Sequence, residues 1–391
     1  MPLLPENLLI QLSTKIHPTE NEFWQMNELL LQIRDWDYLA KTAIEHQAGP
    51  LLYKKLPLLS NQPKIPGFVQ VKLKQAWLKT LSRSMILIDH FKKIAEAFKT
   101  ESIPFIAMKG IFLSDWLYSE IGLRQFSDLD LLVKEEDGKR CLRILSLMGY
   151  ESSGLELPAF VREHSDIIHF PPMVKNGVSV EIHIKIHCDS APYHVDVRDL
   201  WSHAKSVTIH GEETLAFDCN DLLLHLCLHL DKHFCNGKVQ FTCFYDIANL
   251  LNQHTSDIDW ERFKETCLRY KAMKQTYPYI LLLSKYSNAP VPEAIKEEFS
   301  RLLSGRKERH YLGFLAGKVY GSTVPGVFRS LKRSNNPIKS LRFLFGMVFP
   351  PKKYMINRYH IRKQSFIFFY YFYRIFIGVK VLGGAIVNVF R

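Results

Sequence analysis

The chain has 391 residues, and its 47% hydrophobic and 23% charged residues are typical of a folded protein with a large core. This composition excludes a disordered or low-complexity chain, and the length predicts two or three domains. The formal net charge is +12, but the last 61 residues contain 12 Lys and Arg and no acidic residue, so residues 1–330 are neutral, with 39 basic and 39 acidic residues.

The cysteines do not form the pattern of a disulfide framework. There are seven of them, an odd number, and no two are spaced as C-x-x-C. We therefore expect buried thiols in a reducing cytosol. The N-terminus lacks a basic region followed by an apolar stretch, so no signal peptide is predicted. The expected localisation is cytoplasmic, peripheral to a membrane if the C-terminal segment binds one.

Residues 1–100 are predicted to be a helical subdomain. Apolar residues recur at helical spacing over residues 22–39 and 75–98, and three prolines interrupt the link between these stretches. No catalytic constellation stands out here. We expect this subdomain to pack against the part of the chain that follows.

Residues 101–210 are predicted to be an α/β core. The pattern predicts strands over residues 103–108, 126–133, 167–170 and 178–186 and helices over residues 111–118 and 135–148. With helical segments on both sides, this gives an α+β fold class. Two further segments are expected, a helical domain over residues 211–330 and a basic, aromatic segment over residues 331–391.

Two acidic residues share one face of the predicted strand 126–133. Asp128 and Asp130 alternate with apolar residues, so both carboxylates leave the strand on the same side. Two like charges at that separation repel each other, and a divalent cation relieves the repulsion. Mg²⁺ prefers such oxygen ligands and usually keeps substrate phosphates in its shell. The pair therefore predicts a magnesium site.

The predicted strand 178–186 adds a third carboxylate. Its apolar residues alternate cleanly with polar ones, and Glu181 and His183 lie on the polar face. This strand can lie beside the strand that carries Asp128 and Asp130. The other interpretation is that Glu181 faces solvent and pairs with Lys185.

The motifs that contain these residues resemble, in their order along the chain, those of a known family. MKG at 108–110, LR-x-x-x-D-x-D-LLV at 123–133, VEIHIKIH at 180–187 and a later L-x-x-H-x-x-x-H helix occur in this order. The series resembles the uncharacterised bacterial nucleotidyltransferases of the polymerase-β superfamily. The resemblance implies a small mixed sheet flanked by helical segments. It implies transfer of a nucleoside monophosphate from an NTP to an acceptor hydroxyl, with pyrophosphate released.

The resemblance also implies roles for the acids. Asp128, Asp130 and Glu181 would hold Mg²⁺ or Mn²⁺, and Glu181 would act as base for the acceptor. Metal ions held there can bridge the triphosphate and stabilise the leaving pyrophosphate. Substitution of either aspartate by alanine is expected to abolish transfer and to leave the fold intact, because it relieves repulsion.

Nucleotide binding is predicted at Lys109, Gly110 and Arg124. A strand, a glycine and a helix start form a place where phosphate meets backbone N–H groups, and the two cations would contact phosphates. Lys109 could instead be an exposed turn residue, and Arg124 could pair with Asp128 or Asp130. One feature departs from the superfamily, because Gly110 is followed by isoleucine where the superfamily has serine.

Three histidines share one face of a predicted helix over residues 221–233. His225, His229 and His233 follow at i, i+4 and i+8. This spacing can bind a transition metal, so a zinc-dependent hydrolase is a second hypothesis. The resemblance implies that His229 and His233 recur with an aspartate such as Asp246, without a known role. With His183, they are predicted to line the cleft opposite the carboxylates.

The C-terminal segment is basic and aromatic. Residues 366–390 are largely apolar, but Arg374 and Lys380 make a membrane span costly. Three arrangements are open: a span, an interfacial segment, and a helix docked on the protein, and the last is favoured. A basic surface attracts an anionic membrane or another polyanion. The alternative to an enzyme is therefore a non-catalytic protein of the same fold that binds nucleotide, nucleic acid or a membrane surface.

Overall fold

A computed structural model describes most of the chain. The described residues are 3–59, 65–152, 168–187, 191–236, 239, 241–303, 305–317, 345, 349–359, 361 and 363–376. Most of the basic segment predicted over residues 331–391 lies outside these ranges. The first residue of the predicted strand 167–170 does so too.

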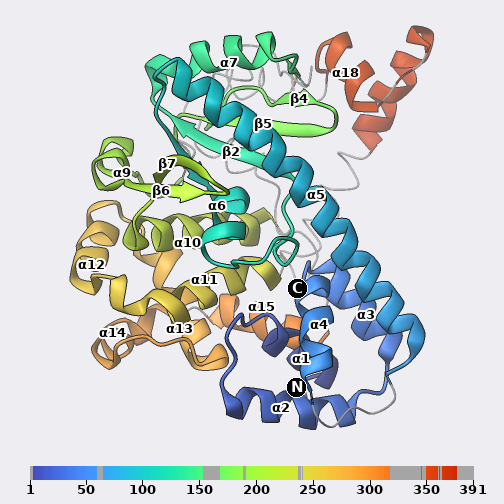
Figure 1. Ribbon diagram of the computed structural model, residues 1–391, viewed down its shortest axis with the longest axis vertical. Coiled ribbons are helices and arrows are strands. Elements are labelled where there is room, and N and C mark those ends of the chain that lie inside the picture. The colour runs from blue at the N-terminus through green and yellow to red at the C-terminus, as the bar shows by residue number, and fades with distance from the viewer. Residues whose placement is uncertain are drawn as a thin grey trace.

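The architecture is α+β, as predicted, and it is built on one mixed sheet of seven strands (Figure 1). The strand β2 lies between β1, to which it is antiparallel, and β5, to which it is parallel. β1 is buried at every position, and β2 at all but its first, so these strands form the centre of the sheet. The order across the sheet is β3 (Glu151–Ser152), β4 (Met173–Lys175), β5 (Val178–His183), β2 (Asp128–Val133), β1 (Phe105–Met108), β7 (Glu212–Ala216) and β6 (Lys205–Ile209).

The sheet differs from the prediction at two places. The strand predicted over residues 178–186 ends at His183, and the described residues of the strand predicted at 167–170 form a single bridge from His169 to His183. The hairpin β6–β7 was not predicted, and it carries the sheet past the predicted limit of the α/β core at residue 210. Its turn, His210-Gly211, has positive φ at both residues. β6 is short and mostly exposed, and its apolar alternation is limited to Val207 and Ile209, which is too short a pattern to mark a strand in the sequence.

Helices cover the sheet and form two further layers. α5 (Gly67–Thr100) packs on β2, β5 and β7 and on α7 (Gly138–Leu147), whereas α6 (Lys109–Trp116) packs on β1, β2 and β6. α10 to α13 pack on one another beneath the sheet in the view of Figure 1. The remaining helices of this part are α9 (Val197–His203), α10 (Cys219–Asn236), α11 (Phe241–His254), α12 (Trp260–Arg269), α13 (Met273–Ser287), α14 (Glu293–Phe299) and α15 (Gly305–Leu315).

The N-terminal part is helical, as predicted, with different boundaries. The helix predicted over residues 22–39 is two helices, α2 (Glu20–Gln32) and α3 (Trp36–Glu45). Ile33 is extended and ends α2, and the Asp35 side chain then accepts from the Tyr38 N–H and caps α3. The helix predicted over residues 75–98 lies within the longer α5. α1 (Pro5–Ser13) and α4 (Gly49–Lys55) complete this layer.

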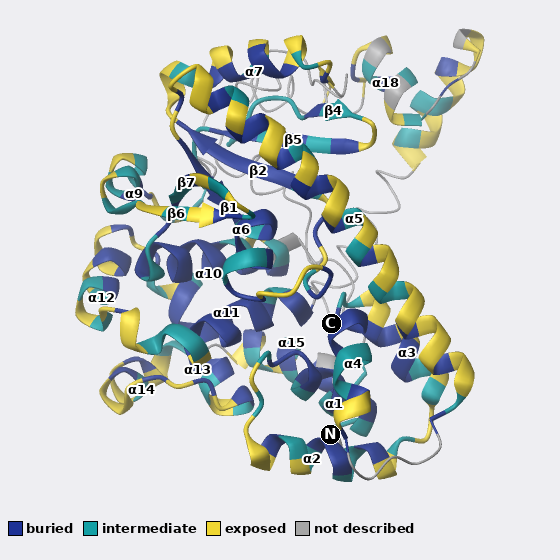
Figure 2. Cartoon of the chain, viewed as in Figure 1, coloured by how far each residue is buried: buried dark blue, intermediate teal, exposed yellow. Residues whose placement is uncertain are grey.

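One hydrophobic core connects the helices and the sheet. It extends from α1 through the sheet to α15, and Figure 2 shows it as buried surfaces that run from the strands into α10 and α11. The described part of the C-terminal segment is not in this core. Met355 of α18 (Lys352–Tyr359), Ile361 and Ile367 form a small separate cluster. The docking of this segment on the helical core, which the sequence favoured, is therefore wrong for the described residues.

Candidate active site

The three predicted carboxylates meet on neighbouring strands. In the parallel pair β2–β5, Asp130 lies opposite Glu181, and in the antiparallel pair β1–β2 it lies opposite Met108, directly before Lys109. The predicted neighbourhood of the two strands is thus confirmed. The strand pairing itself places one acid beside the next and brings the start of α6 to them.

Asp130 lies at the centre of this site, and its side chain is almost fully buried. Its Oδ1 accepts from Lys109 Nζ at 2.7 Å and from His183 Nε2 at 2.7 Å. Burial opposes ionisation, but the charges of Lys109 and His183 outweigh it and hold the pKa of Asp130 well below its usual range. Asp130 is therefore an ionised carboxylate at neutral pH.

Glu181 is held by two histidines. His183 Nε2 lies 3.4 Å and His169 Nε2 3.6 Å from Glu181 Oε2. Burial raises the pKa of Glu181, but the hydrogen bond from His183 and the charge of His169 lower it to a net value below the ordinary one. The interaction of Glu181 is therefore with these histidines, where the sequence suggested Lys185. His169 was not identified as a site residue from the sequence.

Asp128 is the least compensated acid of the site. Its nearest side-chain bond, from Ser127 Oγ, is long at 3.5 Å. Burial and then the charges of Asp130 and Glu181 raise its pKa from 3.8 to about 6. The described residues thus bring three carboxylates together with one lysine and two histidines. Asp128 is the carboxylate that has none of these three as a hydrogen-bond partner.

Lys109 faces the carboxylates and is not an exposed turn residue, since its side chain is 17% exposed. Its backbone has a φ of 49°, the left-handed conformation that residues with a Cβ adopt at a cost. Burial lowers the pKa of Lys109, but Asp130 raises it to a net value above the ordinary one, so the ammonium keeps its charge. The strained backbone at the start of α6 directs this charge to Asp130.

Gly110 is required by close packing. A Cβ at this position would lie 2.7 Å from Cγ of Phe126, a separation that real Cβ atoms do not show. Phe126 leads into β2, so the glycine lets α6 start directly against the strand that carries the two aspartates.

Arg124 forms an ion pair with an acid that neither interpretation of the sequence included. Its Nε and Nη2 donate to the two carboxylate oxygens of Asp246 in α11, at 3.0 and 2.7 Å. The Tyr118 hydroxyl donates to the same carboxylate at 2.8 Å. The sequence predicts a phosphate contact for Arg124, with an ion pair to Asp128 or Asp130 as the alternative, and it assigns no role to Asp246. The observed pair ties the loop before β2 to the helical layer.

The three histidines of α10 do not converge as metal ligands would. His229 and His233 form a pair, with their Nε2 atoms 3.0 Å apart, and the His225 ring is stacked 6.2 Å from that of His229. Burial, followed by the charge of Lys109, lowers the pKa of His225 to about 3 and that of His229 well below its usual range. Within the described ranges, both ring nitrogens of His225 lack a hydrogen-bond partner. Neutral imidazoles thus lie on the α10 side of Lys109.

Three sets of potential metal ligands occur in the described part of the chain. One is Asp130, Glu181 and His183, whose ligand atoms lie within 4.8 Å of one another, and none includes a histidine of α10. The other two lie around the start of α10. They are His203, Asp218 and Asp221, and Cys219, His254 and Asp257.

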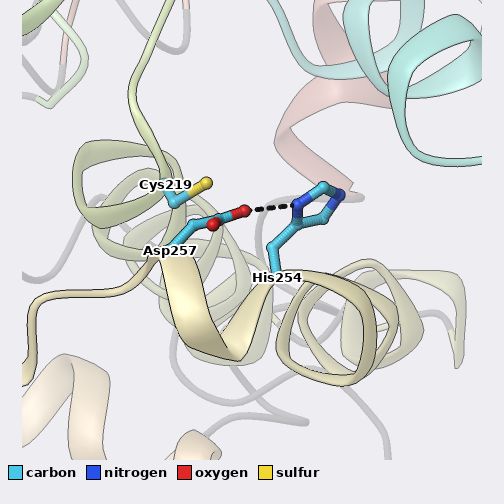
Figure 3. A group of neighbouring side chains, drawn as sticks. All are labelled: Cys219, His254 and Asp257. Atoms are coloured by element: carbon cyan, nitrogen blue, oxygen red, sulfur yellow. Dashed lines mark hydrogen bonds and ion pairs between the residues drawn. The ribbon is translucent and has the colours of Figure 1, made fainter.

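Local structure accounts for those two sets. In Figure 3, Asp257 points to His254, whose Nδ1 lies 2.9 Å away, and Cys219 lies beside this pair. The ring of His254 is stacked 4.1 Å from Trp116. Asp218 accepts from the Asp221 N–H and so caps α10. The set at Asp130 differs because its three residues lie on two paired strands of the sheet.

Comparison with known proteins identifies the family of this chain. A family model described as an uncharacterised nucleotidyltransferase matches residues 32–288, more than half of the chain. No curated protein matches. A solved structure of the antibiotic-resistance factor ANT(2'')-Ia is 10% identical over 58% of this chain and 98% of that chain, and its TM-score of 0.29 is too low to support an argument. The family match includes every residue from Lys109 to Asp246 discussed above, and the chain therefore belongs to the uncharacterised nucleotidyltransferase family and is an enzyme.

Proposed function

We propose that the protein transfers a nucleoside monophosphate from an NTP to an acceptor hydroxyl and releases pyrophosphate, with a bound Mg²⁺ or Mn²⁺ ion. The observation that carries the proposal is the carboxylate set on β2 and β5. Burial and then the charges of Asp130 and Glu181 raise the pKa of Asp128 to about 6. An arrangement that repels its own charge in this way is suited to a cation.

The residues present fit a divalent cation of this kind. Asp128, Asp130 and Glu181 would hold it with carboxylate oxygens, the ligands that Mg²⁺ prefers. His183 offers a nitrogen within the same set, which Mn²⁺ also accepts. When bound, such an ion neutralises the triphosphate and the leaving pyrophosphate.

Lys109 supports nucleotide binding by its charge and position. It starts α6, beside Asp130, and it keeps its proton. An ammonium there can bind a phosphate oxygen of the incoming nucleotide. Arg124 can contact a phosphate only through Nη1, because Nε and Nη2 are hydrogen-bonded to Asp246. The one bond of Nη1, to Gln125 O, is long at 3.5 Å.

Glu181 is suited to the role of base. It is ionised, and at 22% side-chain exposure it is more accessible than Asp130. In the proposed reaction, the acceptor O–H gives its proton to Glu181 while the oxygen bonds to the α-phosphorus. The bond from this phosphorus to the β-phosphate bridging oxygen breaks, and pyrophosphate leaves with both electrons of that bond. Most of the rate then comes from positioning and charge neutralisation.

Thermal-shift titration tests the binding half of the proposal. We expect ATP, GTP, CTP or UTP to raise the melting temperature in Mg²⁺ or Mn²⁺ and not in EDTA. Asp128→Asn should lose this shift, and Asp257→Asn, a carboxylate of the Cys219 set in Figure 3, should keep it. If no NTP stabilises the wild-type protein with either ion, the proposal is wrong.

Turnover is tested by pyrophosphate release with acceptors of four classes: sugars, antibiotics, hydroxyl-bearing peptides and RNA ends. Glu181→Gln keeps the shape of the side chain and removes the base, so we expect nucleotide binding to be retained and pyrophosphate release to be lost. An unchanged rate would assign the base to another residue. Metal-dependent NTP binding without release for any acceptor class would favour the alternative, a non-catalytic nucleotide-binding protein.

A further inference from the structure

The C-terminal helical segment exposes an aromatic surface. η5 (Gln364–Phe366) leads into a helix over residues 367–376, and the pair formed with α18 stands apart from the main body in Figure 1. Five phenylalanines of this segment are between 50% and 71% exposed. We call them the aromatic surface: Phe366, Phe368, Phe369, Phe372 and Phe376.

This helix is amphipathic, but its aromatic side faces solvent and its one charged residue faces inward. Ile367 is buried against Met355 and Ile361, and the Tyr371 hydroxyl donates to Pro350 O at 2.5 Å. Arg374 is the only charged residue of the helix, and it too faces inward, 5.3 Å from the centre of the Tyr354 ring. The phenylalanines occupy the outward side. A surface helix in water shows the opposite distribution, so this face is suited to an apolar partner.

The charge of the segment selects that partner. Residues 331–391 contain 12 Lys and Arg and no acidic residue, and Lys352, Arg358 and Lys363 are exposed in α18 and just before η5. A second copy of the same surface would be repelled. A nucleic acid is anionic and could stack a few bases on these rings, but most of the continuous apolar face would remain uncovered. An anionic bilayer provides both an apolar layer and a negative surface.

We propose that residues 352–376 form a membrane-binding surface that attaches the enzyme to anionic lipid bilayers. The phenylalanines enter the boundary between headgroups and acyl chains, and the lysines and arginines lie at the level of the lipid phosphates. The described helix is about 15 Å long, half the thickness of a hydrocarbon core. No helix in the described part of the chain is long and apolar enough to span a bilayer. The proposed attachment is interfacial, and it is independent of the proposed transfer reaction.

Sedimentation of the full-length protein with vesicles tests the proposal. We expect binding to vesicles of phosphatidylglycerol and phosphatidylcholine, little binding to phosphatidylcholine alone, and release at high salt. The double variant Phe369→Ser/Phe372→Ser should reduce the bound-to-free ratio by roughly tenfold or more, because two inserted aromatic rings are lost. Arg358→Glu/Lys363→Glu should reduce binding to anionic vesicles by a comparable factor.

The matched control lies on α2. Trp24 and Leu31 are 61% and 57% exposed, close to the exposure of Phe369 and Phe372, and α2 contains three Glu and no Lys or Arg. Trp24→Ser/Leu31→Ser should therefore bind vesicles as the wild type does. Equal loss in both double variants, or no binding of the wild-type protein to anionic vesicles, would overturn the proposal.

Two further measurements test whether a second copy of the chain or a nucleic acid, and not a membrane, covers the aromatic surface. If the wild type sediments as a dimer in analytical ultracentrifugation and Phe369→Ser/Phe372→Ser as a monomer, the surface is a contact between copies and the proposal is wrong. If single-stranded RNA binds through the same phenylalanines while vesicles do not, it is wrong as well. Circular dichroism melts of the variants should match that of the wild type, since the substituted side chains are exposed.

Discussion

Two buried aspartates of this protein differ in how well the neighbouring positive charges balance the negative ones. Asp130 and Asp246 are equally buried, at 3% exposure. Asp246 has the guanidinium of Arg124 on both oxygens and the hydroxyl of Tyr118 on one of them, so its charge is matched. Asp130 also has its cation, Lys109, but it shares its surroundings with Asp128 and Glu181.

The difference distinguishes a site built for stability from one built for a ligand. A bidentate arginine pair with its lone pairs satisfied needs nothing further, and it fixes the loop before β2 to α11. Three carboxylates on adjacent strands keep an unbalanced charge, which the fold tolerates at a cost in stability. Substitutions in the two sites should therefore affect different quantities.

The largest effect is expected on turnover. Asp128→Asn should lower kcat/KM for nucleotidyl transfer by about 10³-fold or more, since it removes a carboxylate that would hold the cation. The measurement is pyrophosphate release. Asp137→Asn, an acid just after β2 that pairs with Arg140, serves as control and should act as the wild type does. A rate within about tenfold of the wild type would remove Asp128 from the catalytic site.

Asp246→Asn should act on stability instead. The substitution leaves the buried Arg124 without its charged partner, and the expected loss in unfolding free energy is about 3–5 kcal/mol. Urea denaturation measures it. As control, Asp37→Asn breaks an exposed pair with Lys72 and should leave the unfolding free energy nearly unchanged. If Asp246→Asn kept its stability and lost turnover, the distinction between the two sites would fail.

The pH dependence of stability should reveal the unbalanced charge directly. In EDTA, the pKa of Asp128 is raised from 3.8 to about 6, so the folded protein binds this proton more tightly than the unfolded chain. The resulting stability is fully present below pH 4 and is lost as the pH rises through 6. The difference between the two pKa values corresponds to about 3 kcal/mol.

Asp128→Asn removes this titration. Its stability should exceed that of the wild type by up to about 3 kcal/mol at pH 8, and the gap should narrow at pH 5. Urea midpoints at the two pH values check this. A gap that does not change with pH would mean that Asp128 titrates normally. Asp130 is a poorer probe, because its removal also leaves Lys109 and His183 without their acceptor; the expectation that Asp130→Ala leaves the stability unaffected does not fit these contacts.

The smallest effect is expected at Gly110. Gly110→Ala forces a Cβ against Phe126, and the expected cost is about 1–3 kcal/mol. Urea denaturation would show this cost. Gly67→Ala, at the start of α5, is the matched control, because a Cβ there meets no atom within 4 Å. If Gly110→Ala/Phe126→Ala recovered the stability lost in Gly110→Ala, the clash would be established as the cause. An unaffected Gly110→Ala protein would show that α6 shifts freely.

The sequence predicted the features that depend on local pattern. Alternation placed Asp128, Asp130 and Glu181 on strand faces, and the order of motifs indicated that these strands are neighbours. The partner of Arg124 was missed, because Asp246 lies 122 residues away in another layer and no spacing links the two. The hairpin β6–β7 was missed because the alternation of its exposed edge strand covers only Val207 and Ile209.

The length of α5 has a mechanical consequence. Its 34 residues make a rod of about 51 Å. One end packs on α3 and α4 and the other on β2, β5 and β7. The opposite side is closed as well, because Gln11 of α1 donates to Tyr286 O in α13 and Leu4 N to Leu315 O in α15. The N-terminal helices are thus joined both to the sheet, through α5, and to the C-terminal helices, through α1. A fragment that contains only the strands with the carboxylates would lose both connections, so we expect it not to fold as a separate catalytic unit.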